Sequence, residues 1–279
     1  MFFIFNLLLV GYSSTTSKRI PDKENCICSL RIKLKLIASW HCLTLVGSIQ
    51  LDVLSKLRHP NIATLIGACP EACAIFYEYL PNGSLEDQLS CEDKSPPLSL
   101  QIRIRIAAEI CSVLIFLHSC RIIHGDLKPS RILLDACFVS KLTGFEISHV
   151  FSHDESSNDS ELCRSTEVRG TFGYIDPAYG LTSKITSKSD VYSFGVVLLR
   201  LLTGRPISDI TEMIYENLKI PLDPLAGDWS VVQAEQLAPL ALRCCEIDPN
   251  SRPDLVSVWR ELEQMRDSCG GSSSFSIGF

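Results

Sequence analysis

The 279-residue sequence lacks the features that mark several common classes of protein. It carries 26 Lys and Arg against 32 Asp and Glu, a net charge of −6, so neither nucleic acid nor a membrane is an expected partner. After the apolar start MFFIFNLLLV, no run of residues is long and apolar enough to cross a bilayer. A signal peptide over residues 1–14 is the alternative to the cytoplasmic location that we expect.

The cysteines also lack the spacing of a metal site or a disulfide framework. Thirteen is an odd number, Cys26 and Cys28 are too close for the usual zinc pair, and Cys69-x-x-x-Cys73 has no partner pair with a following His cluster. Disulfide frameworks are typical of much shorter secreted chains. Free thiols in a reducing compartment are therefore the simpler interpretation.

Regular patterning starts near Gly47, because residues 1–46 contain only one alternating stretch, at 30–38, that suits a strand. The helix predicted at 189–203 is nearly all apolar and is expected to be buried, with Gly204 ending it. Apolar periodicity and turn residues together predict helices at 48–57, 100–118, 189–203, 233–245 and 253–266, and strands within 59–71 and 73–80.

The stretch HGDLKP at 124–129 carries residues that phosphoryl transfer needs. That reaction requires positioned phosphates, metal charge on their oxygens and an acceptor for the proton of the substrate hydroxyl. On one loop, Asp126 can orient a hydroxyl while Lys128 faces the transferred phosphate. An Asp-x-Lys pair alone is a weak signal, but GTFGYIDP at 170–177 and SDVYSFGVVLLRLLTG at 189–204 follow it in order.

With these motifs the sequence resembles a protein kinase, and more closely the kinase module of plant U-box kinases, which join a serine/threonine kinase-like domain to a ubiquitin-ligase U-box. LSKLRHPNIATLIGACPE, YEYLPNGSLEDQLS and AEQLAPLALRCCE are stretches typical of that family, and the resemblance runs from Gly47 to Met265. It implies an α+β, two-lobed, protein-kinase-like fold. The expected parts are an unassigned segment at 1–46, a partial and degenerate β small lobe at 47–80, a complete, mainly helical large lobe at 81–266 and a flexible tail at 267–279.

The resemblance implies a catalytic set of Asp126 as base, Lys128 as its phosphate-facing partner and Thr171, which would hydrogen-bond both. Asp190 would anchor the backbone of the catalytic loop, although a residue at a helix start can also be a simple N-cap. The hinge and adenine-pocket positions would be Tyr77, Glu78, Tyr79, Leu80 and Leu133. A hydrophobic spine would contain His124, Phe145, Leu54 and Leu65, which could equally be ordinary core residues.

The sequence departs from the family where a kinase holds metal and nucleotide. Gly144 stands in place of the metal-binding Asp of Asp-Phe-Gly, Glu146 in place of its Gly, and Arg131 in place of the metal-binding Asn. An arginine side chain only donates hydrogen bonds and does not coordinate Mg²⁺. Residues 1–77 contain no Gly-x-Gly-x-x-Gly, and Gln50 replaces the expected lysine-pairing Glu. No metal site and no cofactor are expected; ATP with Mg²⁺ would bind only at a less degenerate site.

Two further departures concern charge pairs. Ala178 replaces a Glu that pairs with an arginine in the family, so Arg252 is predicted to lack that partner. Arg131 and Glu146 carry opposite charges near one cleft. They are expected either to form a latch that replaces the metal or to remain two solvated side chains. A polar stretch at 152–167 is predicted to be an exposed loop.

Three functions compete on this basis. The first is a catalytically inactive kinase fold that binds protein partners, the second an active serine/threonine kinase, and the third a fragment of a U-box ubiquitin ligase. Removing one preorganised charged group from an active site costs about 3–4 kcal/mol of transition-state stabilisation. Several such groups are missing here, so we favour the first function.

Overall fold

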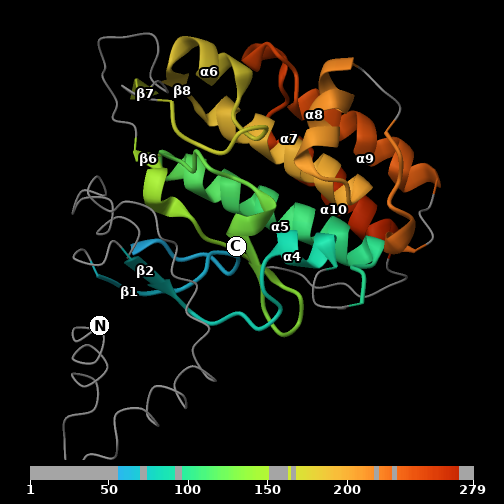
Figure 1. Ribbon diagram of the computed structural model, residues 1–279, viewed down its shortest axis with the longest axis horizontal. Coiled ribbons are helices and arrows are strands. Elements are labelled where there is room, and N and C mark those ends of the chain that lie inside the picture. The colour runs from blue at the N-terminus through green and yellow to red at the C-terminus, as the bar shows by residue number, and fades with distance from the viewer. Residues whose placement is uncertain are drawn as a thin grey trace, which may run out of the picture. The chain divides into compact units, whose positions relative to one another are not determined.

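The computed structural model describes residues 56–69, 74–91, 96–150, 163–164, 168–216, 220–227 and 231–269. Several predictions lie outside these ranges: the strand at 30–38, all but the end of the helix at 48–57, and most of the tail at 267–279. Gln50 and Leu54 also lie outside them. The fold is mixed α/β, mostly helical, with small sheets (Figure 1). The predicted domain boundaries stay predictions.

Four long helices form the main body of the described chain: α5 (Leu100–Ser119), α7 (Ser187–Thr203), α9 (Val231–Cys244) and α10 (Leu255–Cys269). They confirm the helices that apolar periodicity predicts at 100–118, 189–203, 233–245 and 253–266. Ser99 is the N-cap of α5, and its hydroxyl accepts a hydrogen bond from the backbone N–H of Ile102; Gly204 is the C-cap of α7, with a φ of 64°. Helix α7 packs against α9 and α5, and α10 against α5 (Figure 1).

Shorter elements connect these four helices. Three are the short helices α4 (Leu85–Ser90), α6 (Pro177–Thr182) and α8 (Ile207–Glu216). The others are the 3-10 turns η3 (Pro129–Arg131), η4 (Phe145–Ile147), η5 (Pro224–Ala226) and η6 (Pro249–Ser251). Apolar periodicity does not reveal the three short helices. Caps mark the starts of two of them. At α4, Ser84 and Asp87 form a capping box in which the side chain of each accepts the backbone N–H of the other, and Asp176 caps α6.

Each described sheet has two antiparallel strands: β1 (Leu65–Cys69) with β2 (Ala74–Tyr77), β3 (Ile122–Ile123) with β6 (His149–Val150), β4 (Ile132–Leu134) with β5 (Ser140–Leu142), and β7 (Cys163–Arg164) with β8 (Lys184–Ile185). The β1–β2 pair confirms the two predicted strands, over shorter ranges. The prediction of a loop throughout 152–167 is wrong at Cys163 and Arg164, because β8 supplies a pairing partner that is distant in sequence.

The hydrophobic core is centred on α7, whose side chains are almost all buried. Phe194 and Leu198 have no exposed surface, and burial of such a side chain is worth about 1.5–3 kcal/mol. Gly195 permits the close approach of α9, because a Cβ there would lie 2.6 Å from Sγ of Cys245 and 2.9 Å from the Ala241 carbonyl oxygen. Within the described ranges, no helix is both long and apolar enough to span a membrane.

Candidate functional site

The HGDLKP loop follows strand β3 and is fixed by Asp190 in the first turn of α7. One Asp190 oxygen, Oδ2, accepts the backbone N–H of His124 at 2.9 Å and lies 2.9 Å from Nε2 of His118, while Oδ1 accepts the N–H of Gly125 at 3.0 Å. The N-cap interpretation is wrong, because the cap of α7 is Thr186. These contacts are the ones that the predicted anchoring role requires.

Asp190 remains a carboxylate although it is completely buried. Burial alone would raise its pKa, but the hydrogen bond and charge of His118, together with the backbone N–H of Gly125, outweigh burial and lower the pKa. Sequence reasoning missed His118, which lies in the last turn of α5 and is 72 residues from Asp190. No local pattern indicates a contact over that separation.

The three predicted catalytic residues meet at one point beside this loop. The Thr171 hydroxyl donates to Oδ1 of Asp126 at 2.6 Å, and the Lys128 ammonium donates to the Thr171 oxygen at 2.6 Å. Lys128 Nζ also lies 3.5 Å from Oδ2 of Asp126. The structure therefore brings Asp126, Lys128 and Thr171 together, and their chemical roles stay predictions.

Arg131 occupies the other side of the Asp126 carboxylate. Its Nε and Nη2 both donate to Oδ2 of Asp126, at 3.0 and 2.9 Å, and its Nη1 lies 3.5 Å from Oε2 of Glu146. Only 10% of the Arg131 side chain and 3% of the Glu146 side chain are exposed, so the expectation of two solvated side chains is wrong. The predicted partner Glu146 is present, but Arg131 also donates hydrogen bonds to Asp126, which sequence reasoning did not foresee.

Arg131 also fills the space beside Gly144. A Cβ added to Gly144 would lie 2.5 Å from Cδ and 2.7 Å from Nε of Arg131. Gly144 has a φ of 88°, which a glycine adopts at no steric cost. The carbonyl oxygen of Arg131 accepts both the N–H and the hydroxyl of Thr143, at 2.8 and 2.9 Å. The Arg131 side chain thus occupies the space that a side chain at position 144 would need.

The charges around Asp126 keep it ionised. Burial alone would raise its pKa, but the hydrogen bond from Thr171 and the positive charges of Arg131 and Lys128 outweigh burial and lower the pKa. Each carboxylate oxygen already accepts at least one hydrogen bond. Oδ2 accepts two hydrogen bonds from Arg131 and Oδ1 accepts one from Thr171, so a substrate hydroxyl would share this carboxylate with three donor groups.

The predicted hinge residues lie in and just after strand β2. Oε1 of Glu78 accepts the N–H and the hydroxyl of Thr64 at 2.8 and 3.0 Å and lies 3.6 Å from Lys141 Nζ. Tyr79 is exposed and Leu80 is buried. The fifth predicted position, Leu133, is buried on strand β4 and forms an isolated bridge with Ser84.

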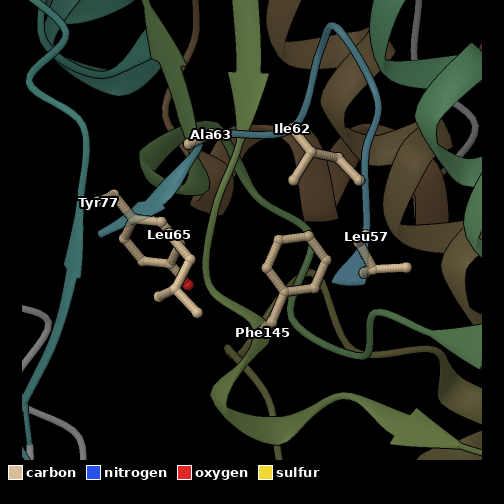
Figure 2. A pocket seen from close by; sticks show the side chains of 6 residues that line it. All are labelled: Leu57, Ile62, Ala63, Leu65, Tyr77 and Phe145. Carbon is tan, nitrogen blue, oxygen red and sulfur yellow. The ribbon is translucent and has the colours of Figure 1, made fainter. Parts of the chain in front are cut away.

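Tyr77 faces a small apolar cavity, together with Leu57, Ile62, Ala63, Leu65 and Phe145 (Figure 2). Its volume is about 10 Å³, comparable with the space that one water molecule needs. An adenine ring would not fit this cavity. Burial, and to a smaller degree the negative charge of Glu146, raise the pKa of Tyr77.

Part of the predicted spine is visible at this cavity. The rings of His124 and Phe145 are 5.1 Å apart in an edge-to-face arrangement, and Phe145 and Leu65 line the same cavity (Figure 2). His124 donates from Nε2 to the Thr143 carbonyl oxygen at 2.9 Å, while its Nδ1 accepts the N–H of Asp126 at 3.2 Å. His124 therefore connects the loop of Asp126 to the segment before Gly144.

Arg252 lacks the Glu that Ala178 replaces, as predicted, but it has another charged partner, Asp176. Its Nη2 and Nη1 donate to the two oxygens of Asp176 at 2.7 and 2.9 Å, and both side chains are buried. Asp176 is the N-cap of α6, two residues before Ala178. The carboxylate that pairs with Arg252 thus belongs to Asp176 in the GTFGYIDP stretch, an acidic residue that sequence reasoning did not consider as a partner.

An anchored loop at 124–131, a buried carboxylate on α7 that holds it and a Thr171 segment beside it define a domain of the protein-kinase class. The chain belongs to the protein kinase domain family, which matches it over residues 31–262. It is 58% identical over 238 residues to U-box domain-containing protein 33 of Arabidopsis thaliana, a match that covers 82% of this chain and 28% of that protein.

Two further plant proteins are also similar. U-box domain-containing protein 70 of Oryza sativa subsp. japonica is 48% identical over 236 residues (81% of this chain and 29% of that protein). U-box domain-containing protein 32 of Arabidopsis thaliana is 42% identical over 246 residues (85% and 29%). The chain thus spans less than a third of the length of these relatives.

Proposed function

We propose that the chain is a pseudokinase domain, with a partial small lobe at 47–80 and a large lobe at 81–266, that acts by binding protein partners in the cytoplasm of a plant cell. The observation that carries this proposal is the buried Arg131 guanidinium, hydrogen-bonded to Asp126 beside Gly144. A cation that belongs to the protein itself thereby stands where the family holds a metal.

The residues present do not fit a kinase metal site. Mg²⁺ prefers oxygen ligands in a near-octahedral arrangement, whereas position 144 has no side chain and position 131 has only donors. Among the residues that the structure describes, no three His, Cys, Asp or Glu side chains gather at metal-binding distances. We therefore derive no transfer step through Mg²⁺ for this chain.

Phosphate transfer from radiolabelled ATP tests this proposal. Purified protein with Mg²⁺-ATP and a generic acceptor protein should incorporate no more label than the Asp126→Asn variant. The matched control is Arg243→Gln, which removes a charge from an exposed ion pair with Glu261 and leaves the loop untouched. Transfer that the wild type performs and Asp126→Asn does not would overturn the proposal.

An active serine/threonine kinase is the second candidate, because Lys128, Thr171 and Asp126 retain mutual hydrogen bonds of 2.6 Å. The same assay decides between the two. A third candidate, part of a U-box ubiquitin ligase, is supported by the names of the relatives. It concerns a longer protein, in which this chain would be the kinase-like part.

A further inference from the structure

We propose that the outer face of helix α8 and the neighbouring Phe172 form a docking surface for a segment of a protein partner that carries both positive charge and apolar side chains. The α8 surface consists of Phe172, Glu212, Tyr215 and Glu216. None of these residues belongs to the hydrogen-bond network of Asp126. The inference rests on the proposed function, because it names the kind of partner and the place where that partner binds.

Contacts with two other segments settle which face of α8 is turned outward. Met213 is buried on the inner side, where α8 packs on α7 (Figure 1). A Cβ added to Gly173 would lie 2.4 Å from Cγ1 of Ile207 and 3.4 Å from Oγ1 of Thr211. The segment that carries Phe172 therefore lies against the first turns of α8, on the side of Ile207 and Thr211.

Two aromatic side chains are exposed on this surface. Phe172 is 85% exposed and Tyr215 is 58% exposed. Tyr215 follows Thr211 by four residues, so the two share one side of the helix. Aromatic rings supply much of the binding energy of protein interfaces, and these two rings can therefore anchor apolar side chains of a partner.

Negative charge accompanies the two rings. Glu212 and Glu216 are exposed, and within the described ranges neither carboxylate has an ion pair or a hydrogen bond. Asp209 differs, because Nη1 of Arg205 lies 3.4 Å from its carboxylate. Like charges four residues apart destabilise a helix, and a cation of a partner placed between Glu212 and Glu216 would remove this repulsion.

The combination of rings and carboxylates selects the class of partner. Two uncompensated negative charges repel the phosphates of a nucleic acid and the headgroups of an anionic membrane. Lysine and arginine bring a positive end together with an apolar stem, and arginine also stacks on aromatic rings. A basic protein segment with apolar residues therefore satisfies both parts of the α8 surface.

Fluorescence anisotropy of a short labelled peptide in which lysine alternates with leucine tests the proposal on the full chain. We expect saturable binding that weakens as NaCl is added, because salt screens exposed charges. Glu212→Lys combined with Glu216→Lys should raise the dissociation constant about tenfold, since two ion pairs are lost. Phe172→Ser should raise it at least about fivefold at low and high salt alike, because this change leaves the charges in place.

The matched control is Glu261→Lys combined with Asp267→Lys, which makes the same change of net charge at exposed positions of α10. This control should bind the peptide as the wild type does, and a peptide with glutamate in place of lysine should not bind. Equal weakening in the α10 control, or wild-type affinity in either variant of the α8 surface, would overturn the proposal. So would the absence of saturable binding by the wild type.

Two further outcomes separate this proposal from its alternatives. A wild-type dimer in sedimentation velocity that Phe172→Ser dissociates would overturn it, because a second copy of the chain would then cover the surface. Peptide binding is measured without ATP, so label transfer in the kinase assay would refute the pseudokinase and leave the binding result as it stands. Loss of the predicted peptide binding in a chain that transfers no label would refute the docking surface alone.

Discussion

Replacing Gly144 with Asp would restore the residue that the kinase family uses for metal, yet we expect the change alone to destabilise this chain. The new Cβ would lie 2.5 Å from Cδ and 2.7 Å from Nε of Arg131. These atoms are in the middle of a side chain whose guanidinium is held by Asp126 and Glu146. Arg131 therefore has to leave its buried ion pair before the introduced aspartate can be accommodated.

The magnitude follows from two contributions. A non-glycine residue in the left-handed region costs about 1–2 kcal/mol, and Gly144 has a φ of 88°. Breaking a buried ion pair costs about 3–5 kcal/mol. The expected loss of about 4–7 kcal/mol is comparable with the whole stability of a typical domain, which is about 5–15 kcal/mol. The melting temperature should fall by at least about 8 °C.

Urea denaturation of Gly144→Asp, Arg131→Asn and the double variant measures this coupling. We expect the double variant to be more stable than the sum of the single effects by about 1–3 kcal/mol, because the shorter side chain of Arg131→Asn leaves room for the new carboxylate. Gly144→Ala is the control that carries the Cβ and the unfavourable φ without the carboxylate. Additivity within about 0.5 kcal/mol, or a Gly144→Asp variant as stable as the wild type, would refute the reasoning.

Three further changes probe the rest of the fold. Phe194→Asp should abolish cooperative thermal unfolding followed by circular dichroism, because it buries a charge in the core, whereas Val256→Asp on the exposed side of α10 should melt normally; a cooperative Phe194→Asp protein would contradict this placement. Asp176→Asn should lower the free energy of unfolding measured in urea by about 3–5 kcal/mol, because it leaves the guanidinium of Arg252 buried without its charge partner; a cost near zero would mean that the carbonyl oxygens of Glu246, Lys188 and Ile247, which also accept from Arg252, suffice. The pKa of Asp190 is lower in the folded state, so its contribution is complete above the unfolded value of about 3.9 and is lost as the pH falls through the folded pKa. The melting temperature of the wild type should therefore fall more steeply in this acid range than that of Asp190→Asn, and equal slopes would exclude the linkage.

The sequence by itself determined the long helices and the identity of the altered residues. Helices α5 and α7 follow from apolar side chains that repeat over several turns, a signal that every turn reinforces. The replacements at Arg131 and Gly144 are visible because each stands at a fixed distance from HGDLKP or within a short triplet. Both kinds of feature can be read from the sequence without knowledge of the fold.

Only the tertiary structure decided which charges meet. Arg131 is five residues from Asp126, but their hydrogen bonds depend on a loop shape that Asp190 holds from α7. Arg252 and Asp176 are 76 residues apart, and strand β7 forms through pairing with β8. Apolar periodicity in the sequence indicates which face of a helix or strand is buried. An ion pair between two irregular segments instead depends on where the packing of the whole chain places those segments.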